Sequence, residues 1–360
     1  MAKETSKYVG CLLGMAVGDA MGYTVDEKTW EQICENYGPN GLLGYDLQND
    51  YAEVTSYTQI AAFVANGLLL GVTRSKQEAY LKHVAIALRE WAKRQHFPRD
   101  PGRSWCWVAQ KPALRRRHCR DHWMLDAFRF ENLGTLQKPV NKADSPGAIT
   151  GAAAVALLYN PSRMEPAQVG SLTASTIALT HGDPVAWLSG VALAYGLAGI
   201  LQEPDGLVAD QFRQAADVME QQFGGRYPQA ASIAAELRAA ICLAEQEDRD
   251  HRADMEQFVC DTADQCLQAA VYAAIACSED FDAAMIMAVN HSGRSAAVGA
   301  LTGAILGARL GQEILPDFYL DSLEPIEELR ELAADLALGS PAKGLFDDAW
   351  DHKYTHGMPL

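Results

Sequence analysis

The sequence lacks the alternation of apolar and polar residues that marks β-strands, and it has few runs of β-branched residues. Alanine and glycine are abundant instead, and apolar residues make up 49% of the 360-residue chain. Small residues let helices pack closely, whereas strands favour β-branched and aromatic side chains. The composition therefore predicts an all-α protein rather than one built on a sheet.

Basic residues are also in short supply. The chain holds 30 lysines and arginines against 46 aspartates and glutamates, which gives a formal net charge of −16 and a pI of about 5.0. A negative field of this size opposes non-specific binding to nucleic acid or to an anionic membrane surface. We therefore expect neither nucleic acid nor a membrane among the partners.

Three further features are missing: paired cysteines, a secretory signal and a membrane span. The eight cysteines are scattered without a CxxC pair, as is typical of reduced thiols. The start, Met1–Thr5, is polar, and Asp19 interrupts the apolar stretch that follows Val9. The longest uncharged run, Pro184–Gln202, falls just short of the roughly 20 residues of a spanning helix, so we interpret it as a buried core helix. Together these features predict a cytoplasmic protein.

What the chain does have is helical periodicity over most of its length. Between positions 59 and 72, for example, Ile60, Phe63, Val64 and Leu68 fall on one face of a helix. The predicted helices are Tyr8–Met21, Gln59–Val72, Gln77–Arg94, Gly147–Tyr159, Pro166–Thr180, Pro184–Leu201, Asp210–Gln222, Ala230–Gln246, Ala263–Cys277, Asp280–Asn290, Ser295–Gly311 and Pro325–Ala337.

No long linker rich in proline, glycine or serine separates these helices. We therefore predict one all-α domain over residues 1–360. The exception to the helical pattern is an irregular segment at about 95–146, which contains several prolines and glycines. A loop of this length in a compact domain is usually functional or an insertion.

Three segments carry a resemblance to a known family. The first, Gly10–Gly22, reads GCLLGMAVGDAMG and is similar to a family opening of the form G-x-x-x-G-x-A-x-G-D-A-x-G. The second, Thr180–Pro184, reads THGDP, like a T-H-x-D/N-P helix junction. The third is Ala269–Gly311, with Ile314–Pro316 after it. In this order and spacing they resemble the ADP-ribosylglycohydrolase family, also called the dinitrogenase-reductase-activating-glycohydrolase-like family.

The resemblance implies an all-α orthogonal helical bundle with a cleft at its centre. Active members of that family hold two Mg²⁺ ions between an early Asp-Asp pair and a late Asp-x-Asp. They hydrolyse the bond that joins ADP-ribose to arginine, serine or a small molecule. Paired carboxylates suit Mg²⁺, which demands near-octahedral oxygen ligation, and two ions can orient the ribose and activate water.

At the early aspartates the chain departs from the family pattern. It reads Thr55, Ser56, Tyr57, Thr58 where the resemblance calls for Ser/Thr-Asp-Asp-Thr. The two outer hydroxyls remain, and both carboxylates are replaced. Tyr57 either plugs the cavity or offers an aromatic face to a base or ribose.

The late aspartates are replaced as well. The family's Gly-Asp-x-Asp-Thr corresponds to Gly293, Arg294, Ser295, Ala296 and Ala297. Neutral hydroxyls alone do not compensate the dehydration of Mg²⁺, and a guanidinium repels a cation. We therefore expect no metal cofactor in this chain, although the family uses Mg²⁺.

Arg294 suggests how the site works without a metal. In one hypothesis its guanidinium substitutes electrostatically for the ions and pairs with Asp19, Asp26 or Glu53, or binds a ligand phosphate. In the alternative it points to solvent or seals a dead cleft. Asp26 stands where the family often carries a glutamate near the scissile bond, so it is the candidate catalytic acid.

A possible phosphate cradle precedes the predicted helix at 147. In the family an Asn-Gly-rich loop helps to hold the diphosphate here, and the resemblance assigns this role to Ser145, Gly147 and Ala148. Pro146 removes one backbone donor from the cradle. The alternative is an ordinary helix start capped by Ser145 or Asp144.

The segment 95–123 offers two further interpretations. His118 and His122 are four residues apart and, with Cys106 and Cys119, suggest zinc, although the spacing matches no standard zinc pattern. The basic run Arg115–Arg117 near three tryptophans suggests a surface for a protein partner, or simply a solvated face.

Three functions remain open from the sequence. The leading one is a pseudoenzyme that binds an ADP-ribosyl or nucleotide-like ligand, an ADP-ribosylated protein or another protein partner. The second is an active hydrolase that cleaves an ADP-ribosyl N- or O-glycosidic bond without metal, with Asp26 or Glu53 as the acid. The third is a structural or interaction protein with a closed cleft. The expected ligand-binding residues are Thr55, Ser56, Tyr57, Thr58, Ser145, Gly147, Ala148, Asn290, Gly293, Arg294 and Ser295.

Overall fold

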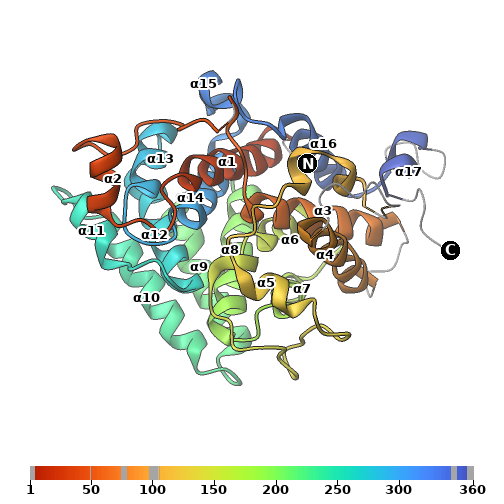
Figure 1. Cartoon of the computed structure of the whole chain (residues 1–360). Coiled ribbons are helices and arrows are strands. Elements are labelled where there is room, and N and C mark those ends of the chain that lie inside the picture. Colours follow the sequence, from red (N-terminus) through yellow and green to blue (C-terminus); the bar gives the residue numbers. More distant parts are fainter. Residues whose placement is uncertain are drawn as a thin grey trace.

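The structure is a computed structural model that describes residues 5–48, 50–73, 79–96, 104, 106–341 and 347–354. Over these residues the protein is all-α, and its extended pairings are isolated bridges, such as the one between Ala52 and Leu323. Figure 1 shows helices that cross one another around a central pair. The predicted all-α bundle is confirmed.

The central pair consists of α1 (Thr5–Tyr23) and α14 (Ser295–Leu310), which pack along their whole length. Glycines make this contact possible. A Cβ atom on Gly14 would overlap the carbonyl oxygen of Gly303, and three further glycines of α1 approach the α14 backbone in the same way. Because the two helices come from opposite ends of the chain, their contact closes the bundle.

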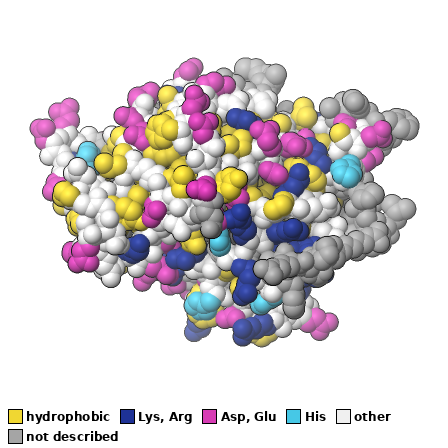
Figure 2. All heavy atoms as spheres, turned by 45° about the horizontal axis from the view of Figure 1, so that its top comes forward, with side chains coloured by type: hydrophobic (Ala, Val, Ile, Leu, Met, Phe, Trp, Pro, Cys, Tyr) yellow, Lys and Arg dark blue, Asp and Glu magenta, His cyan; other side chains and the backbone are white. Residues whose placement is uncertain are grey.

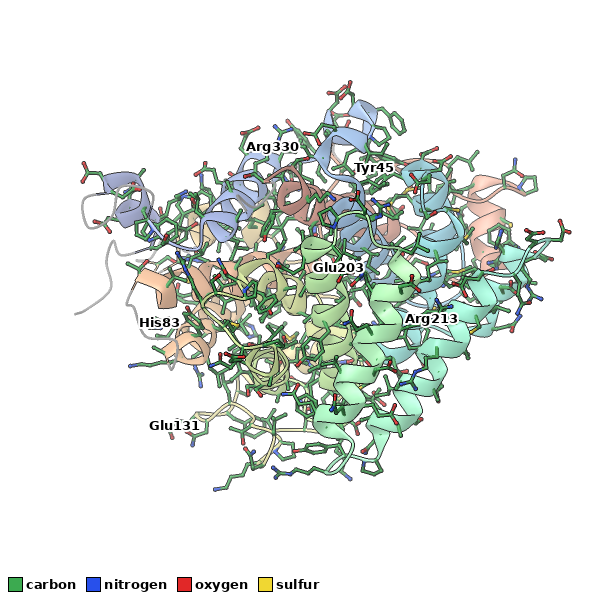
Figure 3. All side chains as sticks on the ribbon, turned by 180° about the vertical axis from the view of Figure 1, so that it is seen from behind. Tyr45, His83, Glu131, Glu203, Arg213 and Arg330 are labelled. Atoms are coloured by element: carbon green, nitrogen blue, oxygen red, sulfur yellow. The ribbon has the colours of Figure 1, made fainter. Side chains whose placement is uncertain are left out.

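Ten further helices of the described chain surround this pair. Figure 3 shows from behind how α9 and α10 form an outer layer, with Arg213 of α9 reaching Glu245 just beyond α10. The surrounding helices are α3 (Ser56–Thr73), α4 (Tyr80–His96), α6 (Gly151–Leu158), α7 (Pro166–Ala178), α8 (Pro184–Gln202), α9 (Val208–Phe223), α10 (Gln229–Ala244), α12 (Ala263–Ala276), α13 (Phe281–Val289) and α16 (Ile326–Leu338).

The other helical elements are short. They are α2 (Trp30–Tyr37), α5 (His122–Ala127), α11 (His251–Gln257), α15 (Asp317–Leu320) and α17 (Asp348–Tyr354), with 3₁₀ turns η2 (Val108–Gln110), η3 (Ala113–Arg115), η4 (Pro146–Ala148) and η5 (Gln312–Ile314).

Each predicted helix corresponds to an observed one, with small differences at the ends. The start predicted at Gly147 is the clearest error, because Pro146–Ala148 form a 3₁₀ turn and α6 begins at Gly151. The beginning of the helix predicted at 77–94 lies partly outside the described residues. Between 106 and 146 the chain forms short elements only, as expected for the segment predicted to be irregular.

Helix α8 is long and apolar enough to cross a membrane by length and composition alone. Its packing gives another reason for that composition, since 78% of its most apolar window is buried inside the protein. It contacts α6, α7, α9 and α10, so its apolar faces are used within the bundle. The interpretation as a core helix is confirmed.

Candidate functional site

Two aspartates, one near the end of α1 and one in the turn after it, cap two different helices. Asp19, near the end of α1, is fully buried at the N-terminus of α3. Its carboxylate accepts four hydrogen bonds, from the amide nitrogens of Thr55 (2.9 Å) and Thr58 (3.0 Å) and from both hydroxyls (2.6 Å each). Burial raises the pKa of Asp19, while these hydrogen bonds act in the opposite direction. The arrangement holds α1 to the start of α3.

Asp26 lies in the turn after α1 and caps the second helix, α14. One carboxylate oxygen accepts the Ala296 amide at 3.1 Å, and the other contacts Arg120 Nε at 2.9 Å. Burial raises the pKa of Asp26, although Arg120, the Ala296 amide and Arg294 all favour its ionised form. The predicted catalytic acid is therefore a buried carboxyl that is paired with a guanidinium.

Arg294 stands beside this pair, at the N-cap position of α14. Its Nη1 is 2.8 Å from Glu27 Oε1 and donates to the Arg120 carbonyl oxygen at 3.2 Å. The side chain is 20% exposed, so it neither points freely into solvent nor is sealed off. Of the acids named in the sequence analysis, Asp26 interacts with it electrostatically, but the direct ion-pair partner is Glu27.

The other two expected partners of Arg294 are engaged elsewhere. Asp19 caps α3, and Glu53 forms an ion pair with Arg116 and lies 3.2 Å from His118 Nε2. Glu27 was not anticipated because its position depends on an unusual backbone. It has a φ of 63°, a left-handed conformation uncommon for a glutamate, and its amide donates to the Gly293 carbonyl oxygen at 2.8 Å.

Tyr57 lies in the first turn of α3 and is fully buried. Its hydroxyl has no hydrogen-bond partner among the described residues. Asp26, Cys266, Arg294 and Asp121 are its electrostatic neighbours, and burial raises its pKa well above the usual value. The ring therefore fills space between the two helix starts as a neutral phenol, as plugging would require.

Asp121, which the sequence analysis missed, organises the expected phosphate cradle. It accepts hydrogen bonds from Ser145 Oγ, from the Trp123 amide at 2.9 Å and from His181 Nε2 at 3.3 Å. Burial alone would raise the pKa of Asp121, but these donors, led by His181, outweigh it and hold the pKa well below the usual range. Gly147 packs directly on this carboxylate, because a Cβ there would lie 2.7 Å from the Asp121 Cγ.

For residues 144–148 the structure decides only the capping interpretation, and phosphate binding there stays a prediction. Ser145 precedes the 3₁₀ turn but makes no side-chain cap, because its hydroxyl is given to Asp121. Capping by Ser145 is wrong. Gly147 and Ala148 are buried beside it, in the turn that Pro146 opens.

Asn290 and Ser295 use their side chains within the fold. Asn290 accepts the Leu42 amide at 2.7 Å and donates to the carbonyl oxygens of Leu42 and Ile286, both at 2.8 Å. Ser295 Oγ donates to the His291 carbonyl oxygen at 3.2 Å and is buried. Ser56 is also buried, and its Oγ accepts the Arg120 amide at 3.0 Å. These three positions hold the loops that carry Arg120 and Arg294.

The donors present do not fit a site for two Mg²⁺ ions. In the part of the chain that the structure describes, no three His, Cys, Asp or Glu side chains are grouped so that they could hold a metal ion. Both threonine hydroxyls at the start of α3 donate to Asp19, and Arg294 places a cation where the resemblance calls for an acid. Mg²⁺ requires several oxygen ligands at once.

The zinc interpretation of the 95–123 segment is also wrong, because its candidate ligands are not grouped around one point. Cys106 is buried apart, Cys119 Sγ lies 3.0 Å from the Asp121 carbonyl oxygen, and His118 contacts the Val54 carbonyl oxygen at 3.0 Å and Glu53 at 3.2 Å.

The basic run of this segment is only partly a surface feature. Arg116 forms ion pairs with Glu53 and Glu324, whereas Arg117 is exposed. Trp107 is buried under Lys111, and Trp123 is 37% exposed; Trp105 lies outside the described residues. Figure 2 shows a band of Lys and Arg side chains across one face of this acidic protein.

Arg120 is the second functional candidate that the sequence did not single out. It joins Asp26, Glu27 and the start of α3, and its side chain is 25% exposed. The only signal was the unusual composition of 118–123, where basic, acidic, thiol and aromatic residues alternate. Arg120 and Arg294 together form what we call the arginine pair.

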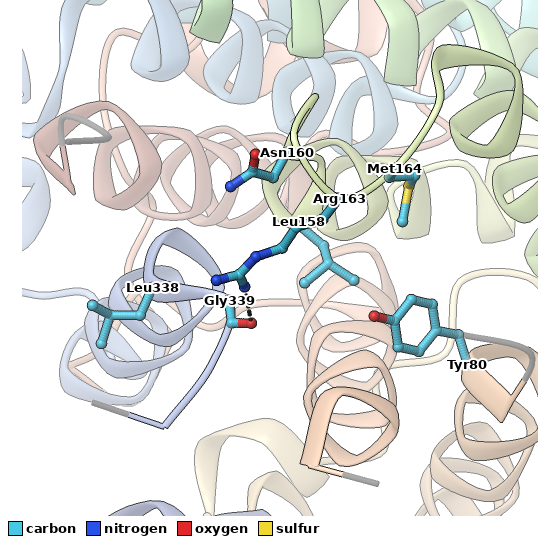
Figure 4. A pocket seen from close by; sticks show the side chains of 7 residues that line it. All are labelled: Tyr80, Leu158, Asn160, Arg163, Met164, Leu338 and Gly339. Carbon is cyan, nitrogen blue, oxygen red and sulfur yellow. Dashed lines mark hydrogen bonds between the residues drawn. The ribbon is translucent and has the colours of Figure 1, made fainter. Parts of the chain in front are cut away.

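Other pockets lie away from the arginine pair, among them one of about 200 Å³ beside Glu203 and one of about 660 Å³ beside Glu131. A cavity of about 50 Å³ between the ends of α6 and α16 is too small for a nucleotide, and Arg163 crosses it to donate to the Gly339 carbonyl oxygen at 2.8 Å (Figure 4). A larger, apolar one of about 360 Å³ lies between α2, α11 and α13. Neither contains a carboxylate.

Comparisons with known proteins agree with the fold. The sequence profile of the family described as ADP-ribosylglycohydrolase matches residues 1–345. A search of curated proteins finds no match. Among solved structures, one described as "ADP-ribosylglycohydrolase-related protein complex" is similar with a TM-score of 0.57 and 20% identity, over 94% of this chain and 100% of that one. Because the family profile spans nearly the whole chain, the chain belongs to the ADP-ribosylglycohydrolase family.

Proposed function

We propose that this chain binds an ADP-ribosyl or related phosphate-bearing nucleotide ligand at the arginine pair and does not hydrolyse it by magnesium chemistry. The observation that carries the proposal is the replacement of a metal-type site by two partly exposed guanidiniums at the N-terminus of α14. Membership of the family suggests the ligand class, and the geometry suggests how it is held.

The electrostatics of this position favour an anion. The N-terminus of α14 carries a partial positive charge, and Arg294 and Arg120 add two full charges, which the carboxylates of Asp26 and the half-exposed Glu27 balance. If Glu27 turns away, the position is left with a net positive charge. A diphosphate that displaces Glu27 from Arg294 gains charge-assisted hydrogen bonds in its place. Since Glu27 is 53% exposed, it can turn into solvent at little cost.

A metal-free hydrolase is the competing function, and one observation favours it. Asp26 is an acid with a raised pKa next to two cations, as a proton donor in a glycosidic cleavage would be. Against it, the Asp26 side chain is fully buried, and both carboxylate oxygens already have donors. Turnover that survives EDTA and disappears in Asp26→Asn would favour this second function.

The decisive experiment is calorimetric titration of ADP-ribose into the purified protein, with excess Mg²⁺ and, separately, with EDTA. We expect the same affinity in both conditions, because no magnesium takes part. An ADP-ribosylated arginine peptide and a serine peptide, titrated in the same way, ask whether a modified protein is the natural ligand. Product analysis by chromatography after the titration reports any hydrolysis.

Two variants make the titration specific. Arg294→Ala removes the half of the arginine pair that holds no buried carboxylate, and we expect affinity to fall by about tenfold or more. Arg330→Ala is the matched control, because the Arg330 side chain is 40% exposed on α16 and, among the described residues, pairs with Glu327 three residues away. Binding that requires Mg²⁺ would contradict the proposal. No binding in either buffer would instead favour a closed cleft and a protein partner.

A further inference from the structure

Two buried cysteines and a buried histidine come together behind Arg294. Cys266 is the fourth residue of α12, and Cys260 precedes the Thr262 N-cap by two residues. A side-chain hydrogen bond joins Cys260 and Cys266 across the start of α12. His291, fully buried with its Nδ1 2.7 Å from the Ser292 carbonyl oxygen, is an electrostatic neighbour of Cys260.

The backbone that carries Cys260 is held in a strained conformation. Val259 has a φ of 62° and Cys260 a φ of 56°, two consecutive left-handed residues, of which the first is β-branched. Such backbone positions are sparsely populated and cluster at functional sites. Here the strain turns the Cys260 side chain inward while Val259 stays 59% exposed.

Contacts from the candidate site keep this turn in place. The Arg294 amide donates to the Cys260 carbonyl oxygen at 3.1 Å. Gly293 lies so close that a Cβ there would be 2.5 Å from the Val259 carbonyl oxygen. The turn and Arg294 are therefore in direct contact.

The two thiols ionise very differently. A hydrogen bond from Cys266, and then the charge of His291, lower the pKa of Cys260 against the effect of burial. Burial and the neighbouring Cys260 raise the pKa of Cys266 well above its usual value. Cys260 is thus the thiol of this pair that ionises more readily, whereas burial raises the pKa of the Cys11, Cys106 and Cys277 thiols.

We propose that Cys260 and Cys266 are a peroxide-sensitive dithiol that closes to an intramolecular disulfide. The Cys260 thiolate attacks one oxygen of hydrogen peroxide, the O–O bond breaks, and sulfenic acid and hydroxide form. The Cys266 sulfur then attacks the sulfenic sulfur, the S–O bond breaks, and the Cys266 proton leaves with the hydroxyl as water. Two thiols lose two electrons in total, and one peroxide is reduced to two waters.

The position of the turn bears on how peroxide reaches Cys260 and on what the disulfide would change. Its outer residues, Val259 and Asp261, are exposed, and peroxide is about as small as water, so a modest opening of the turn suffices. The new bond would tie the start of α12 to the turn that holds the Arg294 amide. This inference does not depend on the proposed ligand, because it concerns the chain alone.

The test is peptide mapping by mass spectrometry of the intact protein after exposure to hydrogen peroxide and quenching with N-ethylmaleimide. We expect a Cys260–Cys266 crosslink, with the other thiols still alkylated. In Cys266→Ser the crosslink cannot form, and dimedone should trap a sulfenic acid at Cys260 about tenfold more than at any other cysteine. Cys242→Ser, which removes an exposed thiol on α10, should leave the crosslink unchanged.

The outcomes separate clearly. Oxidation of Cys242 or Cys34 while Cys260 stays alkylated would overturn the proposal, since exposure alone would then set reactivity. Sulfinic acid at Cys260 without a crosslink in the unaltered protein would overturn the pairing. Near-UV circular dichroism of Cys266→Ser shows whether the fold is retained. The peroxide reaction of the unaltered chain tests the idea even if that variant fails to fold.

Discussion

The N-termini of α3 and α14 are capped in the same way but have different roles. Each is capped by a buried aspartate from the end of α1 or the turn after it, at Asp19 and Asp26. At α3 every partner of the carboxylate is neutral and local, from Thr55 and Thr58. At α14 the carboxylate also pairs with a guanidinium, and a second guanidinium stands next to it.

The difference separates a helix start that stabilises the fold from one that offers a binding site. A carboxylate satisfied by four neutral donors and fully buried can do no further chemistry. Two arginines that are 20% and 25% exposed can still exchange partners with a ligand. The two capping aspartates come from the end of α1 and the turn after it. The chemistry at one helix start can therefore differ from that at the other while α1 packs against both.

The strongest test of this contrast is Asp19→Ala. The change leaves two amides and two hydroxyls at the start of α3 without acceptors in a buried place, so we expect a loss of about 4 kcal/mol in the free energy of unfolding. Urea denaturation followed by circular dichroism measures it. Asp183→Ala is the control, because Asp183 caps α8 with a single bond to the Val185 amide and should cost about 1 kcal/mol. Equal losses would mean that Asp19 is an ordinary cap.

Gly22→Ala should disrupt the packing at the start of α14 through steric overlap alone. A Cβ on Gly22 would sit 2.6 Å from both the amide nitrogen and the Cα of Ala296, which is the residue that Asp26 caps. Because backbone atoms cannot move aside cheaply, we expect a loss of about 3 kcal/mol in stability. Gly225→Ala, where no atom lies within 4 Å of the new Cβ, should be nearly neutral in the same urea titration. A tolerated Gly22→Ala would show that α14 can shift away from α1.

Much of the fold was readable from the sequence, because long helices show their period directly. The segment at 59–72 repeats its apolar face several times and was found as α3, whereas α2 and α11 are too short for a period to emerge. The opening glycines were read as a family motif only. Their physical role, backbone contact with α14, depends on a helix almost 300 residues away.

The candidate site was readable only in part, for the same reason. Thr55, Thr58 and Arg294 stood out because they occupy motif positions. Arg120 and Asp121 did not, since they come from an irregular segment, and Arg120 meets Asp26 across 94 residues of sequence. The Glu27 partner was missed because a left-handed glutamate cannot be foreseen from residue type.

A change to acid pH provides a third test, aimed at the Asp121 carboxylate, which caps α5. Asp121 has a lowered pKa, so its contribution to stability is present above the ordinary pKa of about 3.9 and is lost as the pH falls through the folded value. Asp121→Asn should therefore cost about 2 kcal/mol at pH 7 and progressively less below about pH 4. Urea titrations at several pH values measure the trend. Asp126→Asn, an exposed neighbour on α5, should show little cost at any pH.

The smallest effect on stability should come from Arg294→Ala, although it matters most for ligand binding. Its ion pair with Glu27 is partly exposed, and such pairs contribute about 1 kcal/mol or less. The same urea titration, with Arg330→Ala beside it, measures the change. A loss above about 2 kcal/mol would place Arg294 with Asp19, as a residue that holds the fold. A small loss together with weakened ADP-ribose binding would separate the two helix starts, because the guanidinium would then serve the ligand and not the bundle.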